Sequence, residues 1–155
     1  MTDKTFELVL TRLIDVPRSL VWKVWSNPEH LMQWWCPKPY QTTECRMDLK
    51  PGGEFYTRMI GPDNFDMANS GCFLEIVPER KIAFTDCLKP GYAPAAEGFF
   101  SAIVTMEDED GKTRYTATAL HKNEEDRKKH EDMGFHQGWG TALDQLVAFA
   151  KGLKG

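Results

Sequence analysis

The stretch DMGFHQGWGTALDQLVAFAKGLK, residues 132–154, decides the fold. Its apolar residues recur at steps of three and four, the spacing that places side chains on one face of an α-helix. These residues are Phe135, Trp139, Ala142, Leu143, Leu146, Ala150 and Leu153. Polar residues such as Gln137 and Asp144 fall on the opposite face. The pattern predicts one long helix with a single buried stripe.

Three glycines lie near the beginning of this predicted helix. Gly134, Gly138 and Gly140 lie close to Trp139. A glycine inside a helix costs roughly 1 kcal/mol relative to alanine. We therefore expect this end of the helix to need close backbone approach or empty space. The same end, because it also carries Trp139, is the first place where the sequence suggests a functional site.

Most of the chain before this helix has the alternating pattern of short strands, bounded by Gly, Pro, Asp and Asn turns. The predicted strands cover residues 6–14, 42–49, 54–60, 69–77, 81–86, 98–107 and 113–121. Two short helices are expected after the first strand, the second one capped by Asn27. The segment 88–97 predicts an irregular loop. The charged run 123–131 predicts a solvated helix face, which is either the start of the last helix or a helical lead-in to it.

The order is therefore strand, two short helices, six strands and a long helix. The apolar stripe of the last helix has to pack against a sheet, because the chain offers no other large surface. The first strand has to join the other six, since an isolated strand is unstable. The prediction is an α+β, grip-like fold in which a curved antiparallel sheet of about seven strands closes on the helix, as a single domain over residues 1–155. Such a sheet often leaves a cavity beneath the helix.

Composition and charge exclude several classes of protein. The net charge is −4 with no basic run, so the electrostatic signature of nucleic-acid binding is missing. No segment approaches the roughly 20 apolar residues of a membrane span. Lys4 and Glu7 interrupt any signal-peptide pattern, which favours a cytoplasmic protein.

Motifs for metal binding or covalent catalysis are not found in the sequence. The four cysteines, Cys36, Cys45, Cys72 and Cys87, form no CxxC pair, and His130 and His136 are spaced for different sides of a helix. No serine stands in a GxSxG context, and the glycines form no phosphate loop. We expect neither a metal nor a cofactor.

Four stretches, in this order, match a known family. They are DVPRSLVWKVWSNPEHLMQWW at 15–35, MDLKPGGEF at 47–55, GCFLEIVPERKIAFTD at 71–86 and MGFHQGWGTALDQL at 133–146. The chain resembles the START-like (Bet v-like, SRPBCC) helix-grip superfamily and, within it, the AHSA-like group related to the C-terminal domain of the activator of heat-shock protein 90 ATPase. The resemblance covers essentially the whole chain. It implies a hydrophobic pocket between the sheet and the C-terminal helix, and it names no ligand.

The residues expected to line this pocket follow from alternation along the strands and from the helical stripe. The predicted ligand-binding residues are Trp35, Met47, Phe55, Cys72, Leu74, Phe84, Asp86, Phe99, Tyr115, Met133, His136 and Trp139. A register error of one residue would turn a strand's whole set to the opposite face. Asp86 has two interpretations, either a polar anchor or general base inside the cavity, or a turn cap beyond the end of its strand.

Three functions remain open from the sequence. The preferred one is non-catalytic binding of a small hydrophobic or aromatic molecule by a monomer or weak homodimer, with an uncharacterised physiological role. The second is an enzyme of the polyketide cyclase or hydratase type, which the superfamily also includes. It would require Asp86, His121, His136 or Tyr115 to converge within hydrogen-bond reach.

The third function is a protein-interaction module similar to the chaperone activators. Such a module would present an exposed apolar patch to a protein partner. The segment 34–40, which begins with Trp34 and Trp35, and the 88–97 loop are the places where the sequence could provide that patch.

Overall fold

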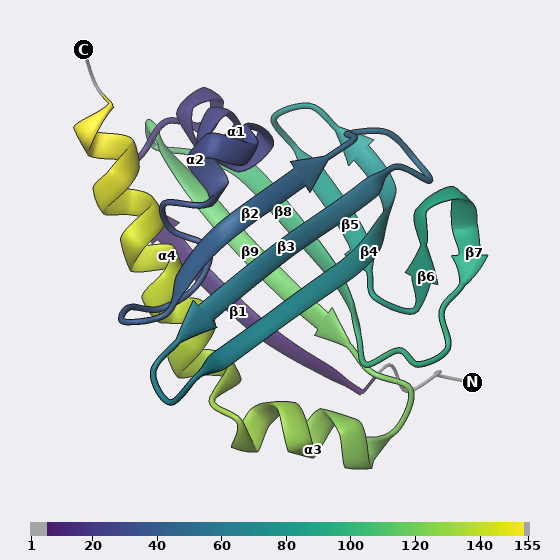
Figure 1. Ribbon diagram of the computed structural model, residues 1–155. Coiled ribbons are helices and arrows are strands. Elements are labelled where there is room, and N and C mark those ends of the chain that lie inside the picture. The colour runs from purple at the N-terminus through teal and green to yellow at the C-terminus, as the bar shows by residue number, and fades with distance from the viewer. Residues whose placement is uncertain (1–5, 154–155) are drawn as a thin grey trace.

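The computed structural model describes residues 6–153 (Figure 1). Lys4 and Lys154, named or quoted above, lie outside these residues. A seven-stranded antiparallel sheet has the order β1-β9-β8-β5-β4-β3-β2. Its strands are β1 (Glu7–Ile14), β2 (Gln41–Met47), β3 (Glu54–Gly61), β4 (Phe65–Val77), β5 (Lys81–Thr85), β8 (Ser101–Glu109) and β9 (Lys112–Leu120). The predicted α+β class with an antiparallel sheet of about seven strands is confirmed.

The first strand completes the sheet beside the last one. β1 pairs with β9 along its whole length, from Glu7 opposite Leu120 to Ile14 opposite Thr113. β1 and β2 are therefore the two edges of the sheet, although only the two short helices separate them in the sequence. Those helices, α1 (Arg18–Ser26) and α2 (Pro28–Leu31), lie near one end of the sheet (Figure 1). Oδ1 of Asn27 accepts a hydrogen bond from the Glu29 amide at 2.9 Å, which is the predicted cap.

The C-terminal segment forms two helices, a short one over the charged run predicted to be helical and the long one predicted from the periodicity. α3 (Glu124–Asp132) and α4 (Phe135–Gly152) are separated by Met133 and Gly134. Gly134 has φ 95°, a left-handed conformation that glycine adopts without steric cost and that commonly ends a helix. The buried stripe of α4 contains Phe135, Ala142, Leu143, Leu146 and Ala150. The buried stripe agrees with the prediction, and the helix begins at Phe135 instead of at residue 132.

The segment predicted as an irregular loop folds into a small hairpin. It consists of β6 (Leu88–Lys89), the short 3₁₀ turn η1 (Pro90–Tyr92) and β7 (Ala93–Pro94). The amide of Gly91 donates to the carbonyl oxygen of Gly52 at 2.7 Å, so the hairpin is attached to the turn before β3. Figure 1 shows it beside β4 and away from α4.

A β-bulge in β4 changes the face that this strand turns to the core. The pairing of β4 with β5 shifts register between Phe73 and Glu75. Phe73 belongs to the main core cluster and stacks on Phe55 with ring centroids 4.8 Å apart. Cys72 and Leu74, predicted to line the cavity, are not members of that cluster, although Cys72 is fully buried. The prediction is corrected here, because strict alternation cannot anticipate the extra residue of a bulge.

None of the helices within residues 6–153 has both the length and the apolar composition needed to cross a bilayer.

Candidate functional site

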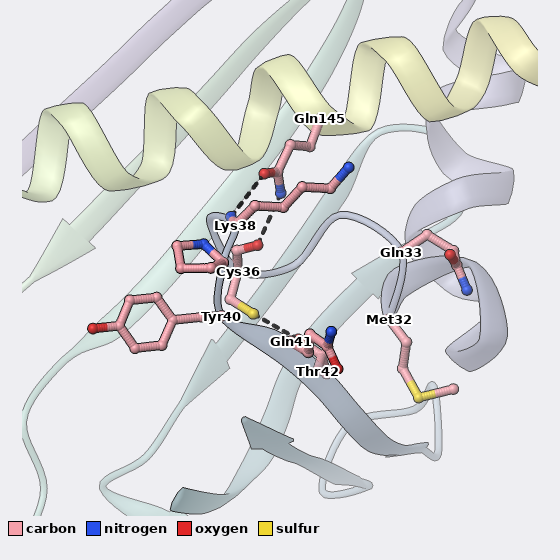
Figure 2. Close-up of a pocket in the computed structure, with 9 residues that line it drawn as sticks. Met32, Gln33, Cys36, Lys38, Tyr40, Gln41, Thr42 and Gln145 are labelled. Carbon is pink, nitrogen blue, oxygen red and sulfur yellow. Dashed lines mark hydrogen bonds between the residues drawn. The ribbon is translucent and has the colours of Figure 1, made fainter. Parts of the chain in front are cut away.

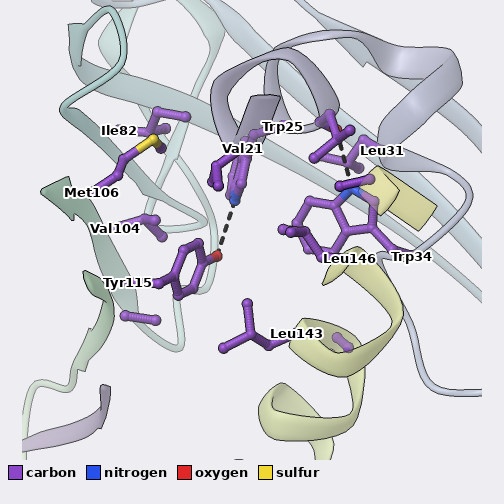
Figure 3. Close-up of a cluster of buried hydrophobic side chains, with 14 of the residues drawn as sticks. Val21, Trp25, Leu31, Trp34, Ile82, Val104, Met106, Tyr115, Leu143 and Leu146 are labelled. Carbon is purple, nitrogen blue, oxygen red and sulfur yellow. Dashed lines mark hydrogen bonds between the residues drawn. The ribbon is translucent and has the colours of Figure 1, made fainter. Parts of the chain in front are cut away.

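Aromatic rings fill the space where the short helices meet the sheet. Trp25 of α1 lies at the centre, with its ring centroid 5.8 Å from Trp34, 5.5 Å from Trp35 and 6.0 Å from Phe84. Its indole N–H donates to the hydroxyl oxygen of Tyr115 at 3.1 Å, as Figure 3 shows. Burial raises the pKa of Tyr115 to about 12. Tyr115 therefore holds the core together and stays protonated at neutral pH.

Four rings continue from this core along the sheet towards the beginning of α4. Trp35 lies 6.2 Å from Phe84, Phe84 lies 6.4 Å from Phe100, and Phe100 lies 5.9 Å from Trp139, all measured between ring centroids. We call Trp35, Phe84, Phe100 and Trp139 the aromatic row. Its members come from the loop after α2, from β5, from the residue before β8 and from α4. Side chains distant in sequence thus form one continuous series of ring contacts.

The aromatic row is packed against the core and yet is not fully covered. Trp35, Phe100 and Trp139 are only partly buried, whereas Phe84 is 7% exposed. Aromatic rings bury large apolar areas and favour edge-to-face contacts with other rings. A set of such rings that keeps accessible surface is suited to an apolar or aromatic ligand.

Several predicted ligand-binding residues belong to this surface. Trp35, Phe84 and Trp139 are members of the row, Phe55 contacts Trp35 with centroids 5.3 Å apart, and Met47 packs against the same core. Phe100 was missed, because the prediction chose the neighbouring Phe99. The alternation of Phe100 with the buried Ala102, Val104 and Met106 is a signal that could have found it.

Asp86 lies just beyond the end of β5 and positions Phe100. Its Oδ1 accepts hydrogen bonds from the amides of Phe99 at 2.8 Å and Phe100 at 3.1 Å. These contacts match the second interpretation of Asp86, a turn cap beyond its strand. A carboxylate occupied in this way fixes the backbone from which the Phe100 ring extends.

Two histidines form a pair beside the row. Nε2 of His121, just after β9, lies 2.8 Å from Nδ1 of His130 on α3. Both side chains are buried, at 7% exposure each. Burial, together with the nearby His121, lowers the pKa of His130 from 6.5 to about 4. This pair could not be predicted from sequence spacing, because its members lie nine residues apart on different elements.

Other predicted residues lie elsewhere. Met133 is 68% exposed at the junction of α3 and α4, so its predicted place in the cavity is corrected. His136 is exposed, with Nε2 3.2 Å from the carbonyl oxygen of Val9 on the edge strand β1. Asp86, His121, His136 and Tyr115 each bond to a different partner. No hydrogen bond within residues 6–153 joins any two of the four groups named for the enzyme hypothesis.

A hollow of about 580 Å³ lies between α4 and the edge strand β2, as Figure 2 shows. It is lined by Met32, Gln33, Cys36, Lys38, Pro39, Tyr40, Gln41, Thr42 and Gln145. Gln145 of α4 holds the loop at residues 32–40. Its amide nitrogen donates to the carbonyl oxygens of Cys36 at 2.8 Å and Trp34 at 3.2 Å, and its oxygen accepts from the Lys38 amide at 3.0 Å. This side chain fixes the loop that carries Trp34 and Trp35.

A smaller hollow of about 340 Å³ carries charges of both signs. It is lined by Asp86, Glu97, Gly98, Phe99, Lys122, Asp126 and Lys129. Phe99, a predicted ligand-binding residue, belongs to this surface, and its ring contacts both His121 and His130. Within residues 6–153, no three His, Cys, Asp or Glu side chains are grouped for metal binding.

Comparison with known families gives one match. The model of the Activator of Hsp90 ATPase homolog 1-like protein family matches residues 15–151. A comparison with curated proteins gives no match.

Solved structures share this fold. A crystal structure of a protein from Nitrosomonas europaea is 43% identical and has a TM-score of 0.94, with 99% of each chain covered. A protein from Mycobacterium smegmatis is 25% identical with a TM-score of 0.78, covering 93% of this chain and 90% of its own. A protein from Aeromonas hydrophila described as AHSA1-like is 18% identical with a TM-score of 0.72, covering 94% and 92%, and supports the fold alone.

Proposed function

The chain belongs to the family of Activator of Hsp90 ATPase homolog 1-like proteins, and we propose that it binds a small hydrophobic molecule, aromatic by preference, against the aromatic row. Family membership does not assign a ligand, because one fold supports many functions. The observation that carries the proposal is the row itself, in which three partly exposed rings and the buried ring of Phe84 follow one another in contact. We propose that binding is non-catalytic.

The expected affinity is modest. A two-ring aromatic molecule that buries about 150 Å² of apolar surface gains ~4 kcal/mol, and ring contacts add about 1–2 kcal/mol. The sum corresponds to a dissociation constant on the order of 0.1 mM. Binding of this strength is observable by nuclear magnetic resonance (NMR) titration.

Two other functions have weaker support. The enzyme hypothesis requires titratable groups to converge, and those it names bond to separate partners. The protein-interaction hypothesis requires a continuous apolar patch. The exposed large hydrophobic side chains of the described residues are distributed over β1, the loop after α2, β3, β4, the small hairpin and the α3–α4 junction. They are Val9, Leu13, Tyr40, Ile60, Met67, Tyr92 and Met133. Binding to an ATPase in order to activate it is therefore not the function we propose.

The five tryptophans provide the test, because each indole N–H gives its own NMR signal. The protein is labelled with ¹⁵N and titrated with 2-methoxynaphthalene. The signals of Trp35 and Trp139 are expected to shift. Trp25 and Trp34 are expected to shift less, since their N–H groups are bonded to Tyr115 and to the Val24 carbonyl. Trp22 of α1, which forms no ring pair within residues 6–153, serves as the internal reference.

Two outcomes would contradict the proposal. One is that no indole signal moves up to the solubility limit of the probe. The other is that Trp22 moves as far as Trp139, which indicates non-specific association. Single Trp→Phe variants assign the five signals.

A further inference from the structure

The histidine pair lies directly beside the aromatic row. The imidazole of His130 has its centroid 5.1 Å from Phe100 and 5.9 Å from Trp139. His121 lies 6.4 Å from Phe100. A molecule seated on Phe100 and Trp139 would therefore lie beside the imidazole of His130 at that end of the row.

Hydrogen bonding fixes which nitrogens carry protons. Nδ1 of His121 is 2.7 Å from the carbonyl oxygen of Phe6, and a carbonyl oxygen only accepts, so this nitrogen carries the proton. In a neutral His121, Nε2 is then a bare acceptor. Nδ1 of His130, 2.8 Å away, has to donate to it. A neutral His130 is consequently left with a bare Nε2.

His130 is neutral at pH 7, because burial and the adjacent His121 lower its pKa to about 4. The nearby charges of Lys122, Asp126 and Lys129 line the mixed-charge hollow that Phe99 borders. Nε2 of His130 forms no hydrogen bond with any residue in the described part of the chain. It is an acceptor available to a ligand or to water.

From this geometry we propose that the site prefers aromatic molecules that carry a hydroxyl group, with Nε2 of His130 accepting the hydroxyl proton in a hydrogen bond. The inference rests on the proposed function of the aromatic row. It adds a ligand class, phenol-like molecules, to a site whose other proposed contacts are apolar. The chain of bonds runs from the hydroxyl to His130, then to His121, then to the Phe6 carbonyl.

A matched pair of probes tests the preference. 2-Naphthol and 2-methoxynaphthalene share the same two rings, and only the naphthol can donate a hydrogen bond. Titrations at pH 7 are expected to show 2-naphthol binding about five- to tenfold more tightly, the value of one neutral hydrogen bond. In His130→Phe, which keeps a ring and removes Nε2, the preference is expected to vanish while 2-methoxynaphthalene still binds.

The outcomes separate this inference from the proposed function. Equal affinities for both probes in the wild type overturn the preference and leave the aromatic row as a binding site. A preference that survives in His130→Phe assigns the acceptor to another group and also overturns the inference. Binding of neither probe overturns both proposals.

A measurement without ligand covers the case in which His130→Phe fails to fold. Long-range ¹H–¹⁵N spectra of the wild-type protein distinguish protonated from bare ring nitrogens. The expected pattern at pH 7 is a proton on Nδ1 of both histidines and none on either Nε2. A proton on Nε2 of His130 would overturn the inference.

Discussion

The indole of Trp139 meets the ring of Phe100 edge-on, with centroids 5.9 Å apart and ring planes at 61°. This contact joins α4 to the beginning of β8 and brings together two residues 39 positions apart. The backbone of Phe100 is fixed by Asp86, whose carboxylate accepts a hydrogen bond from the Phe100 amide. The surface proposed to bind a ligand therefore depends on a carboxylate that is engaged with the backbone.

Replacing Asp86 is expected to act through this backbone support. Asp86→Ala removes the acceptor for two amides and is expected to cost about 1–3 kcal/mol of unfolding free energy and to weaken probe binding. Asp86→Asn keeps an acceptor oxygen, so its loss in stability is expected to be smaller and its affinity close to the wild type. Urea denaturation and probe titration measure both. An affinity loss in Asp86→Asn equal to that in Asp86→Ala would show that the charge itself acts on the ligand.

Gln145 is expected to control the order of the loop at residues 32–40. Gln145→Ala removes three hydrogen bonds to this loop. The free energy of unfolding is expected to decrease by about 2–3 kcal/mol, and hydrogen exchange at the Lys38 amide is expected to become faster. Gln137→Ala, at an exposed position of the same helix, is the matched control and should change neither quantity. Unchanged exchange at Lys38 in Gln145→Ala would refute this role.

The glycines of α4 are expected to differ in their response to alanine. A Cβ at Gly138 meets nothing within 4 Å, so Gly138→Ala is expected to raise the unfolding free energy by about 0.5–1 kcal/mol through helix propensity. A Cβ at Gly140 would lie 2.6 Å from Nη2 of Arg12. Gly140→Ala therefore has to displace the guanidinium that pairs with Asp144, and should gain less. Thermal denaturation of the two variants compares them, and the opposite order would contradict this explanation.

The free energy of unfolding is expected to decrease as the pH is lowered, and His130 is expected to account for part of this decrease. Its pKa is lowered in the folded state to about 4, below the ordinary 6.5, so the unfolded chain takes up this proton first. The contribution of the neutral His130 to the free energy of unfolding is lost as the pH falls from 6.5 towards 4. Between pH 7 and pH 5 it amounts to about 1–2 kcal/mol. Urea denaturation should show a smaller pH dependence in His130→Phe than in the wild type, and equal dependence would contradict the assignment.

The architecture was largely predictable because its signals are periodic. The stripe from Phe135 to Ala150 identifies the helix that packs on the sheet, and the alternating segments identify the seven strands. Gly134, after a run of charged residues, also carried the signal for the break between α3 and α4. These features depend on local spacing, which the sequence displays directly.

The inner surface was less predictable because it depends on single-residue offsets and on tertiary contacts. The bulge after Phe73 turns this residue into the main core cluster, whereas Cys72 is buried outside that cluster and Leu74 is only partly buried. The pair formed by His121 and His130 requires α3 to fold back beside the end of β9. No spacing rule for one element predicts a contact between two.

The most direct test of the aromatic row is a titration of 2-methoxynaphthalene into the wild type, Trp139→Ala and Met133→Ala. Trp139 is a member of the row, whereas Met133 is an exposed apolar residue two positions before α4. Binding is expected to be about tenfold weaker in Trp139→Ala and unchanged in Met133→Ala. Equal affinities in all three proteins, or a loss confined to Met133→Ala, would contradict it.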